Sequence, residues 1–290
     1  MEEFFPGKGR IRSPVVGGIF YPEDKAGVLS MLSAPLPAGQ NAEKNGRATA
    51  LIAPHGAWEI SGSVAKAAFS AAAVTAADRG GAKSPSRIVL MGPIHDLRED
   101  GLFLSDSHAF RTPLGDIPVD REISEKLFSC STLFEINDIP HLREHSLEVL
   151  LPFVKYGFPG AKIVPVLMGN PRPALISALA RALRVIFEPI LDDTLLVISS
   201  NLSIDTDETR SLGQAEECIR RLFEKDADAL IAGLAEKRFK LCGGGLVASL
   251  LKSGLVDSMQ ARLITRPLLK GQTEDGAVIY FGALSYERVR

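Results

Sequence analysis

Four short apolar runs along the chain predict strands buried inside a sheet. They are nearly continuous in apolar residues, as strands covered on both faces are, and span 48–53, 87–91, 162–168 and 194–199. Segments with helical spacing of apolar residues alternate with these runs. The candidate helices span 61–78, 121–128, 145–155, 172–187, 207–234 with a break, and 246–252. This alternation predicts an α/β fold with a mainly parallel, doubly wound sheet and helices on both faces.

The late part of the chain predicts two further strands, at 259–265 and 277–284, as antiparallel additions to the sheet. The Gly/Pro-rich stretches 34–47 and 79–86 predict loops that are too short to link two domains. The chain shows no internal repeat or low-complexity tract, so we expect residues 1–290 to form a single domain.

Composition narrows the class of protein. The chain has 290 residues, 46% of them hydrophobic, and a formal charge of −2, which argues against nucleic acid or an anionic membrane as a partner. The start, MEEFFPGKGRIR, is unlike a signal peptide. The apolar stretch 64–77 is interrupted by Lys66 and falls short of the roughly 20 residues that a membrane span needs. Three cysteines make no disulfide framework, so we expect a cytoplasmic protein with reduced thiols.

Two histidines follow predicted strands directly. His55 comes after the first strand and His95 after the second, each in a turn that contains a proline. Open parallel sheets bind ligands at the carboxyl ends of their strands, so both side chains are candidate metal ligands. Each can equally be a structural histidine with ordinary hydrogen-bond partners.

A glycine-rich stretch, "LCGGG", places Cys242 just before a predicted helix. A helix N-terminus stabilises a thiolate, which serves as a nucleophile or a metal ligand. The alternative is a small buried cysteine before a turn. The stretch lacks the Lys-Ser/Thr pair of a phosphate-binding P-loop.

Another stretch, "HLREH", carries His141, Glu144 and His145 in the H-x-x-E-H order of inverted zinc peptidases. On one helix the two histidines would bind zinc and Glu144 would act as base. Pro140 directly before His141 argues against a long helix there. The alternative is a polar entry into a helix whose apolar residues belong to the core.

Several stretches, in order along the chain, resemble the signatures of one family. They are "RSPVVGGIFYP", "IAPHGAWEISG", "LMGPIHD", "RTPLGDIPVD", "EHSLEVLLPF", "VISSNLSID" and "LCGGG". From Arg12 to about Gly245 the chain resembles the Memo family, whose bacterial and archaeal members are called AmmeMemoRadiSam system protein B.

The resemblance implies a fold like that of the class III extradiol dioxygenases, which hold Fe(II) with two histidines and a glutamate. In the Memo family a cysteine stands in place of that carboxylate. The matching residues here are His55, His95 and Cys242, and the implied metal is iron(II) or copper, with zinc also suited to these donors. The resemblance further implies redox chemistry, a small-molecule ligand and, for bacterial members, radical-SAM partner proteins.

The chain departs from the family pattern beside this site. The family's S-S-D-x-S-H carries Asn201 and Ile204 in place of the Asp and the His. In a dioxygenase that histidine is an acid/base or an extra ligand, and isoleucine can be neither. Asp205, with Glu208 three residues later, is typical of a helix capping box. Glu59, after His55, is either a replacement ligand or base, or a solvated loop acid.

The family's E-H pair is Glu144 and His145 in this chain. These two residues, with Asn201, are our candidate substrate-binding residues, and His145 and Glu59 are our candidates for catalysis. The alternative is that Glu144 and His145 only orient neighbouring groups through hydrogen bonds.

Three hypotheses follow. The first is a metal-dependent redox or dioxygenase-like protein at His55, His95 and Cys242, which requires these side chains to converge. The second is a non-catalytic binding or scaffold protein that kept the fold and needs no cofactor, since losing a proton donor costs roughly 10² to 10⁴ in rate. The third is a zinc hydrolase at His141, Glu144 and His145.

Overall fold

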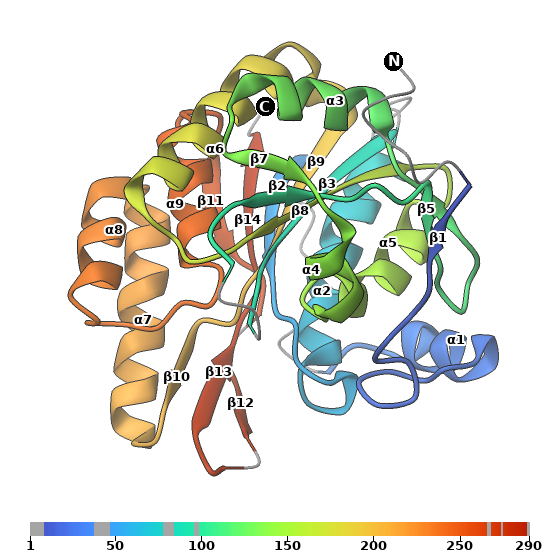
Figure 1. Cartoon of the computed structure of the whole chain (residues 1–290). Coiled ribbons are helices and arrows are strands. Elements are labelled where there is room, and N and C mark those ends of the chain that lie inside the picture. The colour runs from blue at the N-terminus through green and yellow to red at the C-terminus, as the bar shows by residue number, and fades with distance from the viewer. Residues whose placement is uncertain are drawn as a thin grey trace.

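An eight-stranded mixed sheet forms the centre of the computed structural model, with strand order β11-β14-β2-β9-β3-β8-β4-β7 (Figure 1). The structure describes residues 9–37, 47–77, 84–95, 99–265, 268–273 and 275–288. Most of the two predicted loops, 34–47 and 79–86, lies outside these residues. The four central strands are parallel and match the four predicted ones: β2 (Arg47–Ala53), β9 (Thr194–Ser199), β3 (Arg87–Pro93) and β8 (Lys162–Met168).

Shorter strands flank this parallel centre. The other strands of the large sheet are β11 (Gln260–Leu263), β14 (Leu284–Arg288), β4 (Leu102–Leu104) and β7 (Phe134–Ile136). On one side β14 pairs antiparallel with both β2 and β11, and on the other β4 pairs antiparallel with β8 and parallel with β7. The predicted antiparallel addition near 259–265 is therefore confirmed as β11.

Two three-stranded sheets complete the β-structure. One consists of β10 (Ser203–Asp205), β13 (Val278–Phe281) and β12 (Leu269–Gln272), all antiparallel. The other consists of β1 (Ile11–Arg12), β5 (Ala109–Phe110) and β6 (Ile117–Pro118). The predicted strand near 277–284 is thus β13, which lies in a small sheet rather than in the large one.

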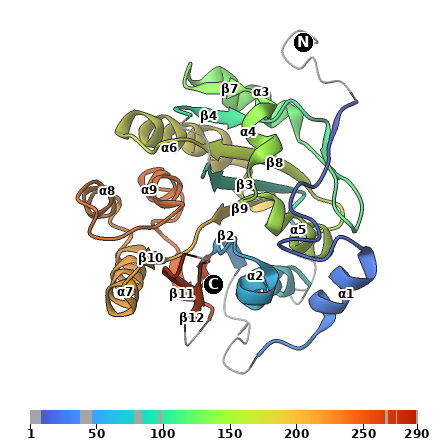
Figure 2. The same ribbon diagram turned by 60° about the horizontal axis from the view of Figure 1, so that its bottom comes forward.

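Helices cover both faces of the large sheet (Figure 2). In β2, Ala50 and Ile52 belong to one hydrophobic core and Leu51 and Ala53 to another, because successive strand residues point to opposite faces. The helices of the first core are α3 (Arg121–Cys130), α6 (Pro173–Phe187), α7 (Glu208–Glu224), α8 (Ala227–Ala235) and α9 (Gly244–Lys252). Those of the second core are α1 (Lys25–Ser33), α2 (Trp58–Ala77) and α5 (Leu151–Gly157).

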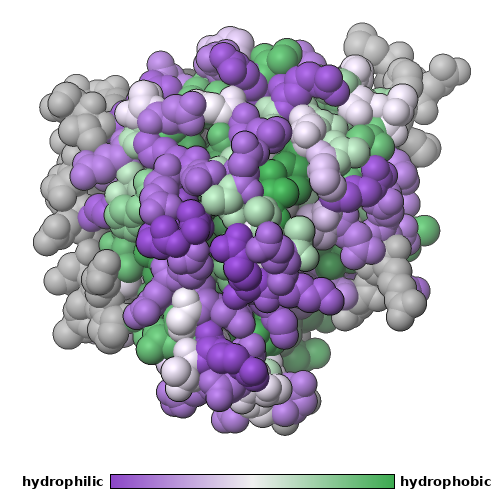
Figure 3. All heavy atoms as spheres, turned by 90° about the vertical axis from the view of Figure 1, so that its left-hand side faces the viewer, coloured by the Kyte–Doolittle hydropathy of each residue, from purple (hydrophilic) through white to green (hydrophobic). Residues whose placement is uncertain are grey.

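The sequence of helix α7 has the apolar and charged spacing of a surface helix. Its buried residues Ala215, Cys218 and Leu222 recur at helical spacing. On its outer side Arg220 pairs with Glu217 and Glu224, and Figure 3 shows the face over α7 and α8 as largely hydrophilic. No helix in the described parts of the chain combines the length and apolar character needed to cross a membrane.

The helix predicted over 207–234 breaks where the sequence analysis allowed a break. Lys225 takes a left-handed conformation with φ 56°, which ends α7, and Asp226 caps α8. The capping-box prediction for Asp205 and Glu208 was wrong. Asp207 is the N-cap of α7, with its carboxylate accepting the N–H of Arg210 at 2.8 Å, while Asp205 accepts the N–H of Asp207.

The helix predicted over 145–155 does not begin at His145. Helix α4 (Asp138–Arg143) ends first, and a short 3₁₀ turn, η1 (Glu148–Leu150), then leads into α5. Between them the Glu144 carboxylate accepts the N–H groups of His145 at 2.9 Å and Ser146 at 2.8 Å. Because a side chain satisfies these N–H groups, the backbone here forms a loop instead of a helix.

This loop, residues 144–147, crosses the carboxyl ends of β3 and β9. The Ser146 hydroxyl donates to the carbonyl of Pro93 at 2.8 Å, and the Ser199 hydroxyl donates to the carbonyl of Ser146 at 2.6 Å. The loop approaches so closely that a Cβ on Gly92 would lie 2.5 Å from Ser146 Oγ and 2.7 Å from Leu147 Cδ2. The glycine of the "GPIH" stretch is therefore required for packing.

We expect Gly92→Ala to destabilise the protein by about 1–3 kcal/mol, the usual result of overpacking a tight contact. Gly213→Ala is the matched control, because Gly213 is exposed in α7 and its Cβ would meet nothing within 4 Å. The control should be stabilised by up to about 1 kcal/mol through helix propensity. Urea unfolding followed by the fluorescence of Trp58 measures both changes, and equal stabilities would contradict this view of Gly92.

Candidate metal centre

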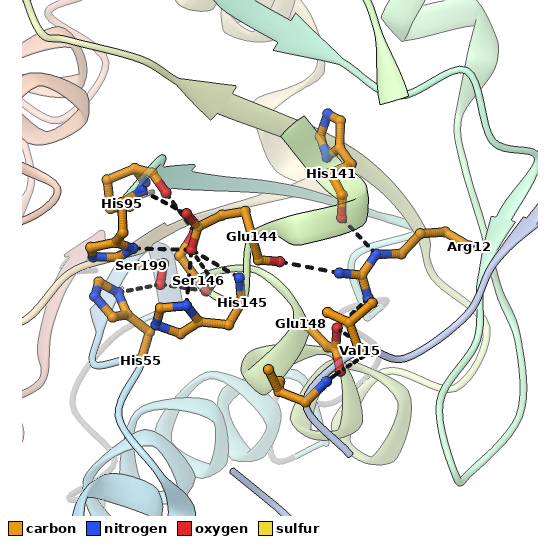
Figure 4. A network of polar contacts seen from close by, with 12 residues as sticks. Arg12, Val15, His55, His95, His141, Glu144, His145, Ser146, Glu148 and Ser199 are labelled. Carbon is orange, nitrogen blue, oxygen red and sulfur yellow. Dashed lines mark hydrogen bonds and ion pairs between the residues drawn. The ribbon is translucent and has the colours of Figure 1, made fainter. Parts of the chain in front are cut away.

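Three of the chain's five histidines meet at the carboxyl ends of the parallel strands. His55 follows β2, His95 follows β3, and His145 lies in the loop after α4. One potential ligand nitrogen from each ring lies within 4.8 Å of the other two. The ring centroid of His95 lies 4.9 Å from those of His55 and His145. Figure 4 shows the three side chains next to one another. This spacing brings the three rings within reach of a single ion.

The His55 ring is buried and held in one tautomer. Its Nδ1 lies 2.8 Å from Ser199 Oγ, and the only O–H of Ser199 is donated to the carbonyl of Ser146. Ser199 must therefore accept from Nδ1–H, which leaves Nε2 with a lone pair. This Nε2 is buried and has no hydrogen-bond partner. A buried acceptor without a partner is costly, and a metal ion at this position would satisfy it.

The carboxylate of Glu144 orients the other two rings. Its Oε1 lies 3.0 Å from His95 Nδ1 and 3.2 Å from His145 Nδ1, and its Oε2 accepts the backbone N–H of His95 at 2.7 Å. Burial raises the pKa of Glu144, but the hydrogen bonds and charge of His95 outweigh it and bring the value to about 2. An ionised carboxylate only accepts, so Nδ1 of His95 carries the hydrogen. Glu144 thus fixes the orientation of the His95 and His145 rings through their Nδ1 atoms.

The electrostatics of the His55 and His95 rings differ. Burial, followed by the neighbouring His95 and His145, holds the pKa of His55 well below its ordinary value. Burial also lowers the pKa of His95, but hydrogen bonds to Cys242 and Glu144 raise it to about 10. The side chains of His95 and His145 are 31% and 23% exposed, so the centre can be reached from solvent.

Cys242 forms a hydrogen bond with the His95 ring but is not a member of the group of three histidines. It precedes the N-cap of α9, and the three glycines after it serve close packing. A Cβ on Gly243 would lie 2.7 Å from the carbonyl oxygen of Ser199, and the Gly243 N–H donates to Ser200 Oγ at 2.9 Å. This contact seats the turn against the end of β9. All three cysteines of the chain are free thiols.

The structure therefore brings His55, His95 and His145 together, with Cys242 in contact with the His95 ring but outside this group. Asn201 is buried beside them, where its side-chain oxygen accepts the backbone N–H of His55 at 3.2 Å. Glu59 is exposed in the first turn of α2 and is not a member of the histidine group.

The stretch "HLREH" does not form a zinc-peptidase site, and that hypothesis was wrong. Helix α4 ends at Arg143, so His141 and His145 do not share a helical face. The ring of His141 contacts the carbonyl of Phe103 at 3.1 Å, away from His145 (Figure 4). Burial is the main cause that lowers its pKa to about 4.

Ile204 is the residue found where the S-S-D-x-S-H pattern has its histidine. It lies on the same side of its small sheet as Phe281. In β10 it pairs with Ile279, and strand alternation puts Ile279 and Phe281 on one face. The Phe281 ring packs against Gly56, the residue after His55. The side chain at 204 thus belongs to an apolar wall beside the loop of His55.

Comparison with known proteins gives a consistent picture. A family model described as Memo-like protein matches residues 12–266. A MEMO1 family protein of Thermotoga neapolitana is 30% identical over 256 residues, covering 84% of this chain and 88% of the relative. One from Nitrosopumilus maritimus is 26% identical over 285 residues, covering 95% and 99%. An uncharacterized Escherichia coli K12 protein of known structure shares the fold, with a TM-score of 0.50 and 11% identity over 81% of this chain and 98% of that one.

We expect Glu144→Gln to lower the pKa of His95 from about 10, because a neutral amide no longer stabilises the imidazolium. Titration of the metal-free protein by ¹⁵N NMR measures this change. Glu122→Gln is the control, since Glu122 forms an exposed pair with Lys126 and should leave His95 unchanged. An unaltered His95 titration in Glu144→Gln would contradict the role given to this carboxylate.

The same pair predicts a pH window of stability in the metal-free protein. The Glu144 contribution is present above its unfolded pKa of about 4.5 and is lost as pH falls through about 2. The His95 contribution is complete below its unfolded pKa of about 6.5 and is lost as pH rises through about 10. Glu144→Gln should therefore lose most stability between roughly pH 4.5 and 6.5, and less near pH 10, in urea unfolding.

Proposed function

This chain belongs to the Memo family, and we propose that it is a mononuclear transition-metal protein of redox or dioxygenase-like function. In this proposal His55, His95 and His145 hold iron(II) or copper. The observation that carries it is the lone pair on His55 Nε2, buried without a partner and grouped with two other imidazoles. His141 Nδ1 is also buried without a partner, but His141 lies outside the histidine group, so it is the grouping of His55 with two other imidazoles that points to a metal.

The donor set supports this choice of metals. Imidazole suits iron, copper and zinc, and a thiolate adds affinity for copper(I), iron and zinc. We propose that Cys242 supports the ion from outside the histidine group, through its contact with the His95 ring. A bound iron or copper ion would supply electron transfer or dioxygen binding at its open positions. Zinc fits the same donors without redox chemistry.

The chain's own residues prepare this chemistry by fixing the rings. Ser199 and Glu144 accept the Nδ1–H groups of His55 and His95, which leaves the opposite nitrogens for the ion. Asn201 holds the backbone of His55. We therefore assign Glu144 and Asn201 to ring and backbone positioning, and His145 to metal binding. The exposed His95 and His145 edges give a small molecule its approach.

Ile204 limits which reactions the site can catalyse. No proton can be given or taken by Ile204, so a ring-cleaving reaction that needs an acid/base there is disfavoured. We propose a redox role that needs no proton donor at this position. The second candidate, a non-catalytic binding or scaffold protein, is favoured by the same residue and by Asn201. Radical-SAM partner proteins and a cytoplasmic location stay predictions.

We expect His55→Ala and His145→Ala each to abolish iron or copper retention in protein purified without oxygen. Cys242→Ser should weaken retention by about 10- to 100-fold, as loss of a supporting group does. His108→Ala is the control, because His108 is exposed and outside the histidine group. Metal analysis after reconstitution checks this. A wild type that stays empty contradicts a metal role, and full retention by His145→Ala would remove His145 from the ligands.

Oxygen consumption separates the two candidate functions. We expect protein loaded with iron(II) or copper(I) to consume dioxygen when exposed to air and to return to the reduced state with ascorbate. His145→Ala, treated identically, should do neither. Retention of zinc alone, or a loaded protein that leaves dioxygen untouched, would favour the binding or scaffold role.

A further inference from the structure

We propose that Arg12 and Glu148 are positioning residues that set the geometry of the metal centre, although neither side chain belongs to the histidine group. They form a buried ion pair, called here the Arg12–Glu148 pair. The inference rests on the proposed function, because it concerns the shape of the same site. It assigns a role to two residues of the polar network in Figure 4 that lie apart from the three histidines.

The guanidinium of Arg12 fixes the segment that carries Glu144. Its Nε donates to the carbonyl of His141 at 2.9 Å, its Nη2 to the carbonyl of Glu144 at 3.1 Å, and its Nη1 to the Glu148 carboxylate. Its side chain is only 1% exposed. One planar group thus holds residues 141, 144 and 148 at once, which the single ammonium of a lysine cannot reproduce.

The carboxylate of Glu148 binds the segment of residues 15–21 next to Arg12. It accepts the N–H groups of Val15 and Val16 and the hydroxyl of Tyr21, each at 2.9 Å. Burial and the nearby carboxylate raise the pKa of Tyr21, so that hydroxyl keeps its proton and donates. The neighbouring Phe20 then sets the edge of its ring against His145, with centroids 4.9 Å apart.

Two routes therefore run from this pair to the histidines. The first passes from Arg12 through the backbone of Glu144 to its carboxylate, and from there to His95 and His145. The second passes from Glu148 through Tyr21 and Phe20 to the face of His145. A shift of the pair would thus move two of the three rings.

Stability alone does not account for this arrangement. Replacing a buried ion pair by two apolar side chains of similar size is often neutral or stabilising, whereas removing one partner leaves an unpaired charge. The pair therefore has a use that an apolar pair would not serve. The hydrogen bonds of the pair, which go to the carbonyls of His141 and Glu144 and to residues 15–21, identify that use as placement.

The test uses the double variant Arg12→Met/Glu148→Met, which removes both charges together. Its matched control is Arg262→Met/Glu287→Met, a partly buried pair between β11 and β14 at the other side of the sheet. Cobalt(II) is titrated into metal-free protein. We expect the first variant to lose about 10- to 100-fold in affinity, as changes behind metal ligands do, and the control to bind as wild type.

A second readout needs no metal. In metal-free protein the ¹⁵N NMR signals of the His95 and His145 rings should differ between wild type and Arg12→Met/Glu148→Met, and should be unchanged in the control. Lowered thermal stability with wild-type cobalt affinity and unchanged ring signals would overturn the inference. If wild type fails to bind cobalt, the proposed function fails, and the ring signals still decide whether the pair positions the histidines.

Arg12→Lys provides the test if the double variant does not fold. It keeps a positive charge for Glu148 but gives up the hydrogen bonds to the carbonyls of His141 and Glu144. We expect this variant to fold and to bind cobalt(II) about tenfold less tightly than wild type. Wild-type affinity in Arg12→Lys, with unchanged ring signals, would overturn the inference.

Discussion

The buried carboxylate of Glu144 is the constraint on which the site depends. It accepts backbone N–H groups from three positions, at His95, His145 and Ser146, and it faces Nδ1 of both histidine rings. These contacts stop a helix from forming through His145 and direct its ring toward His55. Because the same oxygen atoms shape the backbone and orient the rings, the loop and the metal centre form together.

The sheet supplies the other half of the arrangement. Parallel strands β2, β3 and β9 end at one edge, so that His55, His95 and Asn201 arrive there from distant parts of the chain. Glycine at position 92 lets the loop of His145 lie across these ends. Cys242 arrives on a turn whose glycines pack against β9. Local packing rules thus place three potential metal donors around one point, with Cys242 next to one of them.

Much of this could be predicted from the sequence because burial on both faces leaves a clear apolar pattern. The four central strands and the strand-end positions of His55 and His95 were predicted in this way, whereas Cys242 was assigned to the site by the family resemblance. The place of His145 beside His55 and His95 was not predicted, because its helical pattern hid a loop that only the Glu144 carboxylate explains. The tautomer of His55 also could not be predicted from the sequence, since it depends on which group accepts the single hydroxyl hydrogen of Ser199. The H-x-x-E-H pattern misled for a related reason: spacing on a helix has meaning only if the helix exists.

X-ray absorption spectroscopy of the iron-loaded protein tests the central claim most directly, because it reports the atoms bound to the metal. The account predicts scattering from three imidazole rings, with nitrogen at about 2.0–2.2 Å, the usual distance for such ligands. A His145→Ala sample loaded in excess iron should show one imidazole fewer. A wild-type spectrum with two imidazoles and a sulfur would place His145 outside the coordination sphere, and a spectrum of oxygen neighbours alone would contradict a metal centre at these histidines.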